Sequence, residues 1–209
     1  ETGSHDVTKL DRGQAEKTEA ALRIWNSASP VDGTLAADYL ASRGLRLPLP
    51  SAIRFHPSLK HSSGSTWPCM IALVTDGVDG TPRAVHRTFV APDGNGKAPV
   101  APAKMMLGPC SGGAVRLGEP KTVLMVGEGI ETCLAGSTIF GKPAWAALSA
   151  SGMATLDLPK NITEVLVLVD GDDAGESAAR RLRSHLLAEG RLVHLERAPR
   201  GKDFNDVLI

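Results

Sequence analysis

The chain has 209 residues, and its 23 Lys and Arg are balanced by 23 Asp and Glu, so the formal net charge is zero. This length fits one domain or two small ones, and a hydrophobic content of 42% excludes a disordered chain. Aromatic residues make up only 4%, with a single Tyr. Folds that stack bases on aromatic side chains are therefore disfavoured.

The three cysteines, Cys69, Cys110 and Cys133, form no CxxC pair, which excludes a zinc ribbon and a disulfide framework within this chain. We expect a reduced, intracellular protein of the cytoplasm. No segment approaches the roughly 20 apolar residues needed to cross a bilayer, and no signal peptide begins the chain, so no membrane partner is expected.

The neutral total hides an uneven distribution of charge. Residues 1–118 carry 13 bases and 10 acids, whereas residues 119–209 carry 10 bases and 13 acids. Between Thr81 and Gly118 five bases accompany one acid, which makes this stretch a candidate surface for a polyanion. The alternative is that these bases lie on solvated loops. The five are Arg83, Arg87, Lys97, Lys104 and Arg116.

The first half of the chain predicts an α+β subdomain over residues 11–118, after a segment 1–10 that we take as a disordered remnant of an expression tag. Helical spacing runs from Gln14 to Asn26, and Thr34 is a candidate N-cap for a helix that Gly44 ends. Two strands follow, Met70–Thr75 and Arg83–Val90, joined by a Gly- and Asp-rich connection.

Residues 119–209 predict a different architecture, in which four short apolar strands alternate with helices. Continuous apolar strands of this kind indicate a parallel sheet covered on both faces, and ligands of such sheets collect at the carboxyl ends of the strands. The strands are 123–126, 144–148, 165–169 and 192–195, and the helices are 131–139 and 175–188.

Acidic residues follow two of these strands. Glu128 lies in Gly-Glu-Gly after the first strand, and Asp170 and Asp172 lie in Asp-Gly-Asp after the third. Asp170 and Asp172 are two residues apart, so in an extended segment they project the same way and can share a hard cation. With Glu128 they can hold Mg²⁺ that keeps phosphate oxygens as further ligands. The alternative is a polar turn whose Asp173 caps the next helix.

This pair of motifs resembles the toprim domain, which bacterial primases, topoisomerases and some nucleases share. The segment Gly201–Asp206 is similar to the stretch that closes the toprim region of bacterial primases. In the first half, Tyr39–Leu45 resembles a helix of the small primase subdomain that precedes toprim. The whole chain is most similar to toprim primase-like proteins of phages, plasmids and other mobile elements.

The resemblance implies roles for individual residues. Glu128 is expected to be a metal ligand or general base, Asp170 and Asp172 are expected to be metal ligands, and Asp203 is expected to be an outer metal-binding member of the acidic cluster. Basic residues are expected to contact nucleotide or nucleic acid: Arg83, Arg87, Lys104 and Lys202. The expected cofactor is Mg²⁺ or Mn²⁺.

Two positions depart from the primase pattern. Thr132, preceded by Glu131, occupies a position that is Asp in the primase motif, and Asn205 replaces the second Asp of the closing stretch. Both changes reduce the number of carboxylates and place a second or third metal in doubt.

The resemblance implies a primase, a DNA-directed RNA polymerase that makes primers from nucleoside triphosphates on a single-stranded DNA template. A replicative helicase is a further expected partner. Two alternatives remain open: a metal-dependent toprim nuclease, and a toprim nucleic-acid-binding module without activity.

Overall fold

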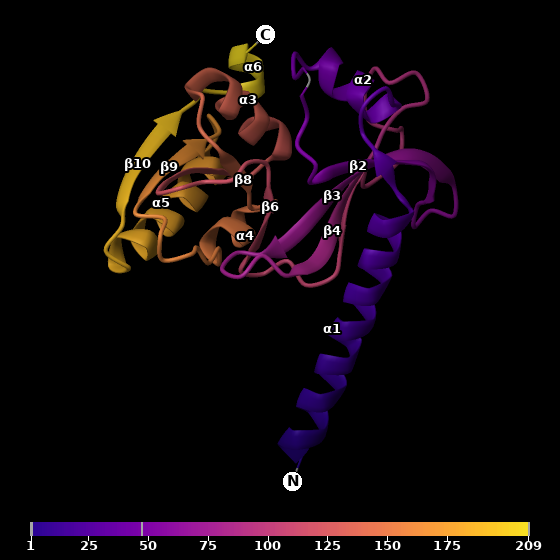
Figure 1. The fold of residues 1–209 in the computed structure, drawn as a ribbon, viewed down its shortest axis with the longest axis horizontal. Helices are drawn as coiled ribbons and strands as arrows, with labels where there is room; N and C mark the ends of the chain where they lie inside the picture. Colours follow the sequence, from indigo (N-terminus) through magenta and orange to yellow (C-terminus); the bar gives the residue numbers. More distant parts are fainter. Residues whose placement is uncertain (1, 47, 209) are drawn as a thin grey trace.

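The computed structural model describes the backbone of residues 2–46 and 48–208 and the side chains of residues 12–46 and 48–208 (Figure 1). The helices are α1 (Thr2–Ser27), α2 (Leu35–Ser42), α3 (Ile130–Phe140), α4 (Ala150–Ala154), α5 (Asp173–Ala188) and α6 (Phe204–Leu208). The strands are β1 (Ser29–Pro30), β2 (Ile53–Lys60), β3 (Thr66–Asp76), β4 (Pro82–Phe89), β5 (Lys104–Leu107), β6 (Gly113–Arg116), β7 (Val123–Gly127), β8 (Ala144–Ala146), β9 (Glu164–Val169) and β10 (Leu192–Arg197). Among the described residues, no helix is long and apolar enough to span a membrane.

The C-terminal half contains the parallel sheet that the sequence predicts, with strand order β8-β7-β9-β10. Its central strands β7 and β9 are almost wholly buried, because helices cover both faces. On one face, α3 and α6 pack on Met125, Leu166 and Leu168. On the other face, α4 and α5 pack on Leu124, Val165 and Val167, among others. This sandwich fixes the carboxyl ends of β7 and β9 side by side.

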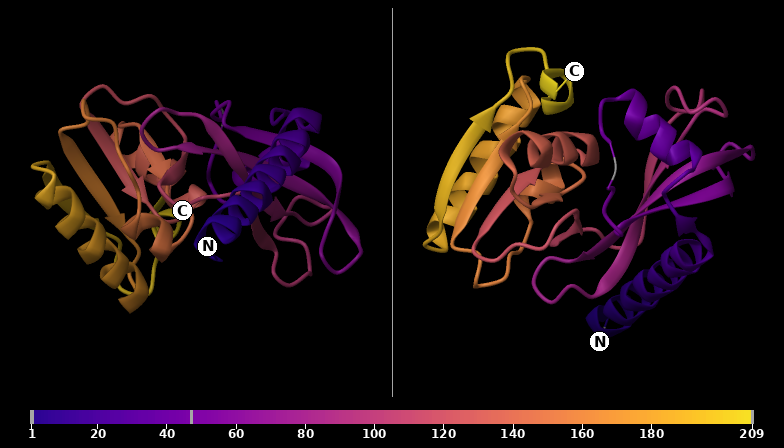
Figure 2. Two further views of the ribbon diagram at one scale, coloured as in Figure 1. Left: turned by 90° about the horizontal axis from the view of Figure 1, so that it is seen from below. Right: turned by 45° about the horizontal axis from the view of Figure 1, so that its top comes forward.

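The N-terminal half is an antiparallel sheet in the order β1-β2-β3-β4-β5. The C-terminal turns of α1 cover one face of it, where Ala21 packs among Cys69, Ile71, Val85 and Phe89. The opposite face joins α2 and the core of the C-terminal half. Figure 2 shows the two halves as lobes that share one continuous path of strands.

Strand β6 connects the lobes. It pairs antiparallel with β3 through Thr75 and Ala114, and antiparallel with β8 through Val115 and Ala146. The domain boundary expected at residue 118 therefore falls between β6 and the C-terminal sheet, although β6 is hydrogen-bonded to β8 of that sheet. The expectation missed β6 because its four residues, although they lie between two Gly-rich turn signals, are at the lower limit of length for a recognisable strand.

Several local expectations differ from the structure. Helix α1 begins at Thr2, so residues 2–10 are helical rather than disordered, since no proline interrupts the segment. Thr34 is the N-cap residue of α2 as expected, but its hydroxyl donates to the Val31 carbonyl and accepts no hydrogen bond from the helix. Helix α2 does end at the expected place, where Gly44 adopts a positive φ of 74° that favours glycine.

Candidate active site

The carboxyl ends of β7 and β9 bring the predicted acids together. Val126 is paired with Val167, so Glu128 and Asp170 leave adjacent parallel strands almost in register. Neighbouring strands lie about 5 Å apart, which sets the spacing of the two backbones here. Glu128 and Asp170 are both partly buried. The prediction that these motifs share one edge of the sheet agrees with this topology.

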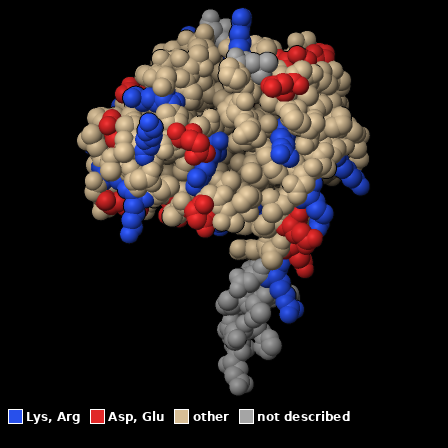
Figure 3. Space-filling view, viewed as in Figure 1, with Lys and Arg blue, Asp and Glu red and all other residues tan. Residues whose placement is uncertain are grey.

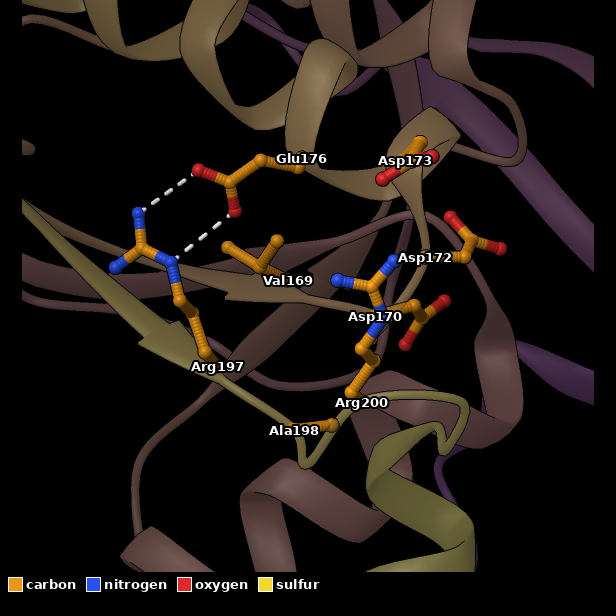
Figure 4. Close-up of a pocket in the computed structure, with 9 residues that line it drawn as sticks. Val169, Asp170, Asp172, Asp173, Glu176, Arg197, Ala198 and Arg200 are labelled. Carbon is orange, nitrogen blue, oxygen red and sulfur yellow. Dashed lines mark hydrogen bonds and ion pairs between the residues drawn. The ribbon is translucent and has the colours of Figure 1, made fainter.

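The turn after β9 orients the two aspartates. Asp172 is the N-cap of α5, and its Oδ1 accepts a hydrogen bond of 2.6 Å from the Gly175 amide. The turn therefore caps the next helix, as the alternative interpretation proposed, but through Asp172 rather than Asp173, which is already the first helical residue. In Figure 4 the carboxylates of Asp170 and Asp172 point to the same side of the loop, while Asp173 points away.

Gly171 lets a second loop approach this turn. Its amide donates to the Lys202 carbonyl at 2.8 Å, and its carbonyl accepts from the Gly201 amide at 2.8 Å. A Cβ at this position would lie 2.1 Å from the Pro199 carbonyl oxygen. The backbone contact therefore requires glycine and joins the Asp-Gly-Asp turn to the Gly201–Asp206 segment.

The acids repel one another. Burial, the largest cause, and the charges of Asp203, Glu128 and Asp172 together raise the pKa of Asp170 to about 6, against the hydrogen bond from Thr132, which lowers it. Burial and the charge of Asp172 also raise the pKa of Glu128, although Lys104 opposes them. Mutual repulsion among partly buried carboxylates is the electrostatic setting in which a divalent cation binds favourably.

Asp203 lies beside this acidic cluster, and its carboxylate also has partners outside the cluster. Its Oδ1 accepts from the Asp206 amide at 2.8 Å, and Asp206 Oδ2 accepts from the Asp203 amide at 3.1 Å, a reciprocal cap of α6. Its Oδ2 lies 3.8 Å from Arg43 Nη2. Both oxygens of Asp203 therefore already have partners within the chain.

A basic wall from the N-terminal lobe faces the acids. Arg43, Lys97 and Lys104 line a cleft of about 220 Å³ together with Glu128, Gly129, Glu131, Thr132, Asp170 and Asp203. Arg43 follows α2, Lys97 lies in the β4–β5 connection, and Lys104 begins β5. The sequence singled out Lys97 and Lys104 within a basic stretch, but Arg43 only as part of a helix end.

The other predicted bases lie elsewhere. Arg87 is opposite Met105 and Lys104 is opposite Thr88, so Arg87 and Lys104 project from opposite faces of the sheet. Arg87 donates to the Met106 carbonyl at 3.2 Å, and burial lowers the pKa of its guanidinium. Arg83 forms an ion pair of 2.6 Å with Asp76 near the other end of β4.

Arg116 has a structural role: its Nη2 donates to the Asp76 carbonyl at 2.9 Å, and its guanidinium lies 4.2 Å from the centre of the Trp145 ring. Lys202 is exposed beside the acidic turn. On the face drawn in Figure 3, bases and acids are interspersed, so the basic stretch does not form one continuous surface there.

The two departures from the primase pattern have structural partners. Thr132 is buried, and its hydroxyl donates to Asp170 Oδ1 at 3.2 Å. Asn205 is fully buried, and with its amide oriented by its neighbours it donates to the Arg43 carbonyl at 2.9 Å and accepts from Arg43 Nη2 at 3.2 Å. Each replaces a carboxylate with a group that holds a neighbouring site residue.

A divalent cation at this edge of the sheet would need several oxygen ligands that converge on one point. Among the described side chains, no group of three or more His, Cys, Asp and Glu is already arranged to hold an ion. The donor chemistry fits a hard cation, because the donors are carboxylate oxygens. The pKa values of Glu128 and Asp170 are raised by burial first and by neighbouring negative charge second. Glu128 and Asp170 line the cleft, whereas Asp172 is exposed and lines a neighbouring pocket together with Asp170. The carboxylates that would hold the cation are these three.

Two family models match the sequence. Residues 15–117 match a domain of unknown function (DUF7146), and residues 123–209 match the toprim domain. No curated protein matches the chain.

Solved structures with the same fold include several primases. A DnaG primase catalytic domain bound to single-stranded DNA has a TM-score of 0.62 and 16% identity, over 94% of this chain and 78% of that one. A DNA primase domain from Pseudomonas aeruginosa has a TM-score of 0.59 and 15% identity, over 92% and 74%. The Aquifex aeolicus primase, with its zinc-binding and RNA polymerase domains, has a TM-score of 0.58 and 17% identity, over 93% and 58%.

Proposed function

Since residues 123–209 are a toprim domain within the fold of a primase catalytic core, we propose that this chain is a metal-dependent nucleotidyltransferase. Its reaction is the synthesis of short RNA primers on single-stranded DNA from nucleoside triphosphates. The cofactor is Mg²⁺ or Mn²⁺.

One observation carries the proposal: the cleft has an acidic wall from the toprim domain and a basic wall from the N-terminal lobe. Glu128 and Asp170 line the first wall, and Arg43, Lys97 and Lys104 line the second. A nucleoside triphosphate with its metal presents both charges, because the cation needs oxygen ligands and the phosphates need cationic donors. The cleft offers both kinds of group. A groove lined only by bases would bind nucleic acid but would provide no oxygen ligands for the cation.

Each wall has a separate task in this proposal. Lys104 and Arg43 bind the triphosphate, and Lys97 at the exposed entrance attracts the polyanion. Glu128, Asp170 and Asp172 supply the carboxylate oxygens for the metal, and Asp172 is held in place by its bond to the Gly175 amide. Glu128 has a second task in the proposal: one of its oxygens accepts the proton of the primer hydroxyl while the other binds the metal, and its pKa, raised by burial and by the charge of Asp172, favours proton acceptance.

The metal, when bound, would lower the pKa of the attacking hydroxyl and neutralise charge that develops as pyrophosphate leaves. The Asp-Gly-Asp turn is braced by the loop after β10 through Gly171 and Lys202, so the carboxylates are supported by backbone bonds on a rigid sheet edge.

The proposal is tested by incubating purified protein with four nucleoside triphosphates, a single-stranded DNA template and Mn²⁺. We expect oligonucleotides from the unsubstituted protein and from an Asp173→Ala control, and at least a hundredfold less from Asp170→Ala. Absence of product above the Asp170→Ala level would overturn the proposal.

The same preparation distinguishes the rival functions. Nicking of plasmid DNA that depends on Mn²⁺ and needs no nucleoside triphosphate would identify a nuclease. DNA binding that EDTA and Asp170→Ala leave unchanged, without either activity, would identify a binding module.

The proposal extends to the biological setting. A primase of a phage, plasmid or other mobile element would work with a replicative helicase in the cytoplasm, where template and nucleoside triphosphates occur. These partners follow from the proposed reaction and share its test.

A further inference from the structure

Glu131 lies one residue before Thr132 and close to the acidic cluster, but its environment differs from that of the other acids. Its side chain is 7% exposed, and both of its oxygens are already bound. Oε1 accepts a hydrogen bond of 2.7 Å from the Tyr39 hydroxyl, and Oε2 lies 3.0 Å from Lys104 Nζ. Both oxygens of Glu131 are therefore engaged by Tyr39 and Lys104. Glu128 and Asp170, by contrast, line the cleft without such partners from the described part of the N-terminal lobe.

The three groups come from three separate elements. Glu131 is in the first turn of α3, Tyr39 is in α2, and Lys104 begins β5. The contacts thus cross from the toprim domain to the N-terminal lobe, and they meet at the cleft that Lys104 and Glu131 both line. Tyr39 is almost completely buried, whereas the Lys104 side chain is 36% exposed, so the ammonium is the member of the trio that a ligand can reach.

The charge of Glu131 is stable in this setting. Burial raises its pKa, but Lys104 and the hydrogen bond from Tyr39 outweigh burial and bring the pKa to about 2. The nearby imidazole of His86 is kept neutral, because burial and the charges of Lys104 and Arg87 lower its pKa to about 4 against the influence of Glu131. Lys104 is therefore the cation that meets Glu131.

We propose that Glu131 is a positioning residue for nucleotide binding: it holds the Lys104 ammonium at the cleft, where Lys104 contacts the triphosphate, and it does not bind metal. This inference rests on the proposed function, since it assigns a nucleoside triphosphate to the cleft. Tyr39 has a supporting role, because its hydroxyl fixes the rotamer of the Glu131 carboxylate. The resemblance to the primase motif assigns no role to Glu131, because the acidic position of that motif is occupied by the neighbouring Thr132.

The test measures binding of a fluorescent ATP analogue in Ca²⁺, binding of Mn²⁺ alone, and KM and kcat for primer synthesis. Glu131→Gln keeps the shape and the bond with Tyr39 but removes the charge that holds Lys104. We expect its ATP dissociation constant and KM to rise about tenfold, its kcat to stay within twofold, and its Mn²⁺ affinity to stay within twofold. The matched control, Glu119→Gln at an exposed position, should change none of these.

A double-mutant cycle separates positioning from a general structural role. If Glu131 acts through Lys104, Glu131→Gln should weaken ATP binding no further in a Lys104→Gln background. Tyr39→Phe, which retains the ion pair, should weaken ATP binding about threefold, and it carries the test if Glu131→Gln lowers the melting temperature so far that the variant is unfolded.

Two results would overturn the inference: a tenfold loss of Mn²⁺ affinity in Glu131→Gln, which would make Glu131 a ligand, or unchanged ATP binding in the folded variant. Failure of the proposed function is recognised separately, because primer synthesis by the unsubstituted protein tests that function, whereas ATP binding requires no catalysis.

Discussion

Replacing Asp170 with Asn should stabilise the metal-free protein at alkaline pH. Its folded-state pKa of about 6 lies above the reference value of 3.8 because of burial and the charges of Asp203, Glu128 and Asp172. Between these two values the folded state binds more protons than the unfolded state, so stability falls as pH rises through this window. The cost is absent below about pH 4 and complete above about pH 7.

The size of the effect follows from the shift. About two pKa units correspond to about 3 kcal/mol at 1.36 kcal/mol per unit, and partial exposure of the Asp170 carboxyl reduces this to about 1–2 kcal/mol. Asparagine removes the charge and retains an oxygen that can accept the bond from Thr132. Asp170→Asn should therefore gain about 1–2 kcal/mol at pH 8 and nothing at pH 3.5.

Urea titrations at the two pH values, in EDTA, measure the difference. Asp173→Asn is the matched control: it removes an exposed charge from the first turn of α5, where a carboxylate is mildly stabilising, so it should lose a few tenths of a kcal/mol. A variant Asp170→Asn that is less stable than the unsubstituted protein at pH 8 would refute the electrostatic reasoning.

Three further substitutions test other parts of the account. Gly171→Ala would place a Cβ 2.1 Å from a backbone carbonyl of the loop after β10, so we expect a loss of about 2–4 kcal/mol in urea titrations; unchanged stability would contradict the close approach. Thr132→Val removes the hydrogen bond to Asp170 and should cost about 1 kcal/mol at pH 8, with a gain arguing against that bond. Arg116→Met loses the stacking on Trp145 and two hydrogen bonds to backbone carbonyls that join the lobes. A melting curve should reveal a loss of about 1–3 kcal/mol, and an unchanged melting temperature would show that these contacts do not stabilise the fold.

The parallel sheet and its acids were predictable because they leave local signals. Strands buried on both faces appear as continuous apolar runs, as in Val165–Val169, and acids directly after such runs fall at one sheet edge. The predicted meeting of Glu128 with Asp170 needed only the order of elements along the chain.

The opposing wall was not predictable in the same way. Arg43 lies far along the chain from Lys97 and Lys104, and the meeting of these three bases with the acids of the C-terminal half depends on how β6 joins the two sheets. Side chains alternate between the two faces of the sheet along β4 and β5, and this alternation decides which bases face the cleft. The basic stretch in the sequence contains both Arg87 and Lys104, but it does not show that they lie on opposite faces. The partners of Glu131 are likewise a tertiary result, since Tyr39 lies 92 residues away.

Glu128, Asp170 and Asp172 form the proposed metal site for nucleotidyl transfer. The most direct measurement is a Mn²⁺ titration monitored by the electron paramagnetic resonance signal of the free ion, with ATP present. We predict binding by the unsubstituted protein, at least tenfold weaker binding by Glu128→Gln and by Asp172→Asn, whose amide can still cap α5, and unchanged binding by Asp173→Asn. Equal Mn²⁺ affinity in all four proteins would contradict the account.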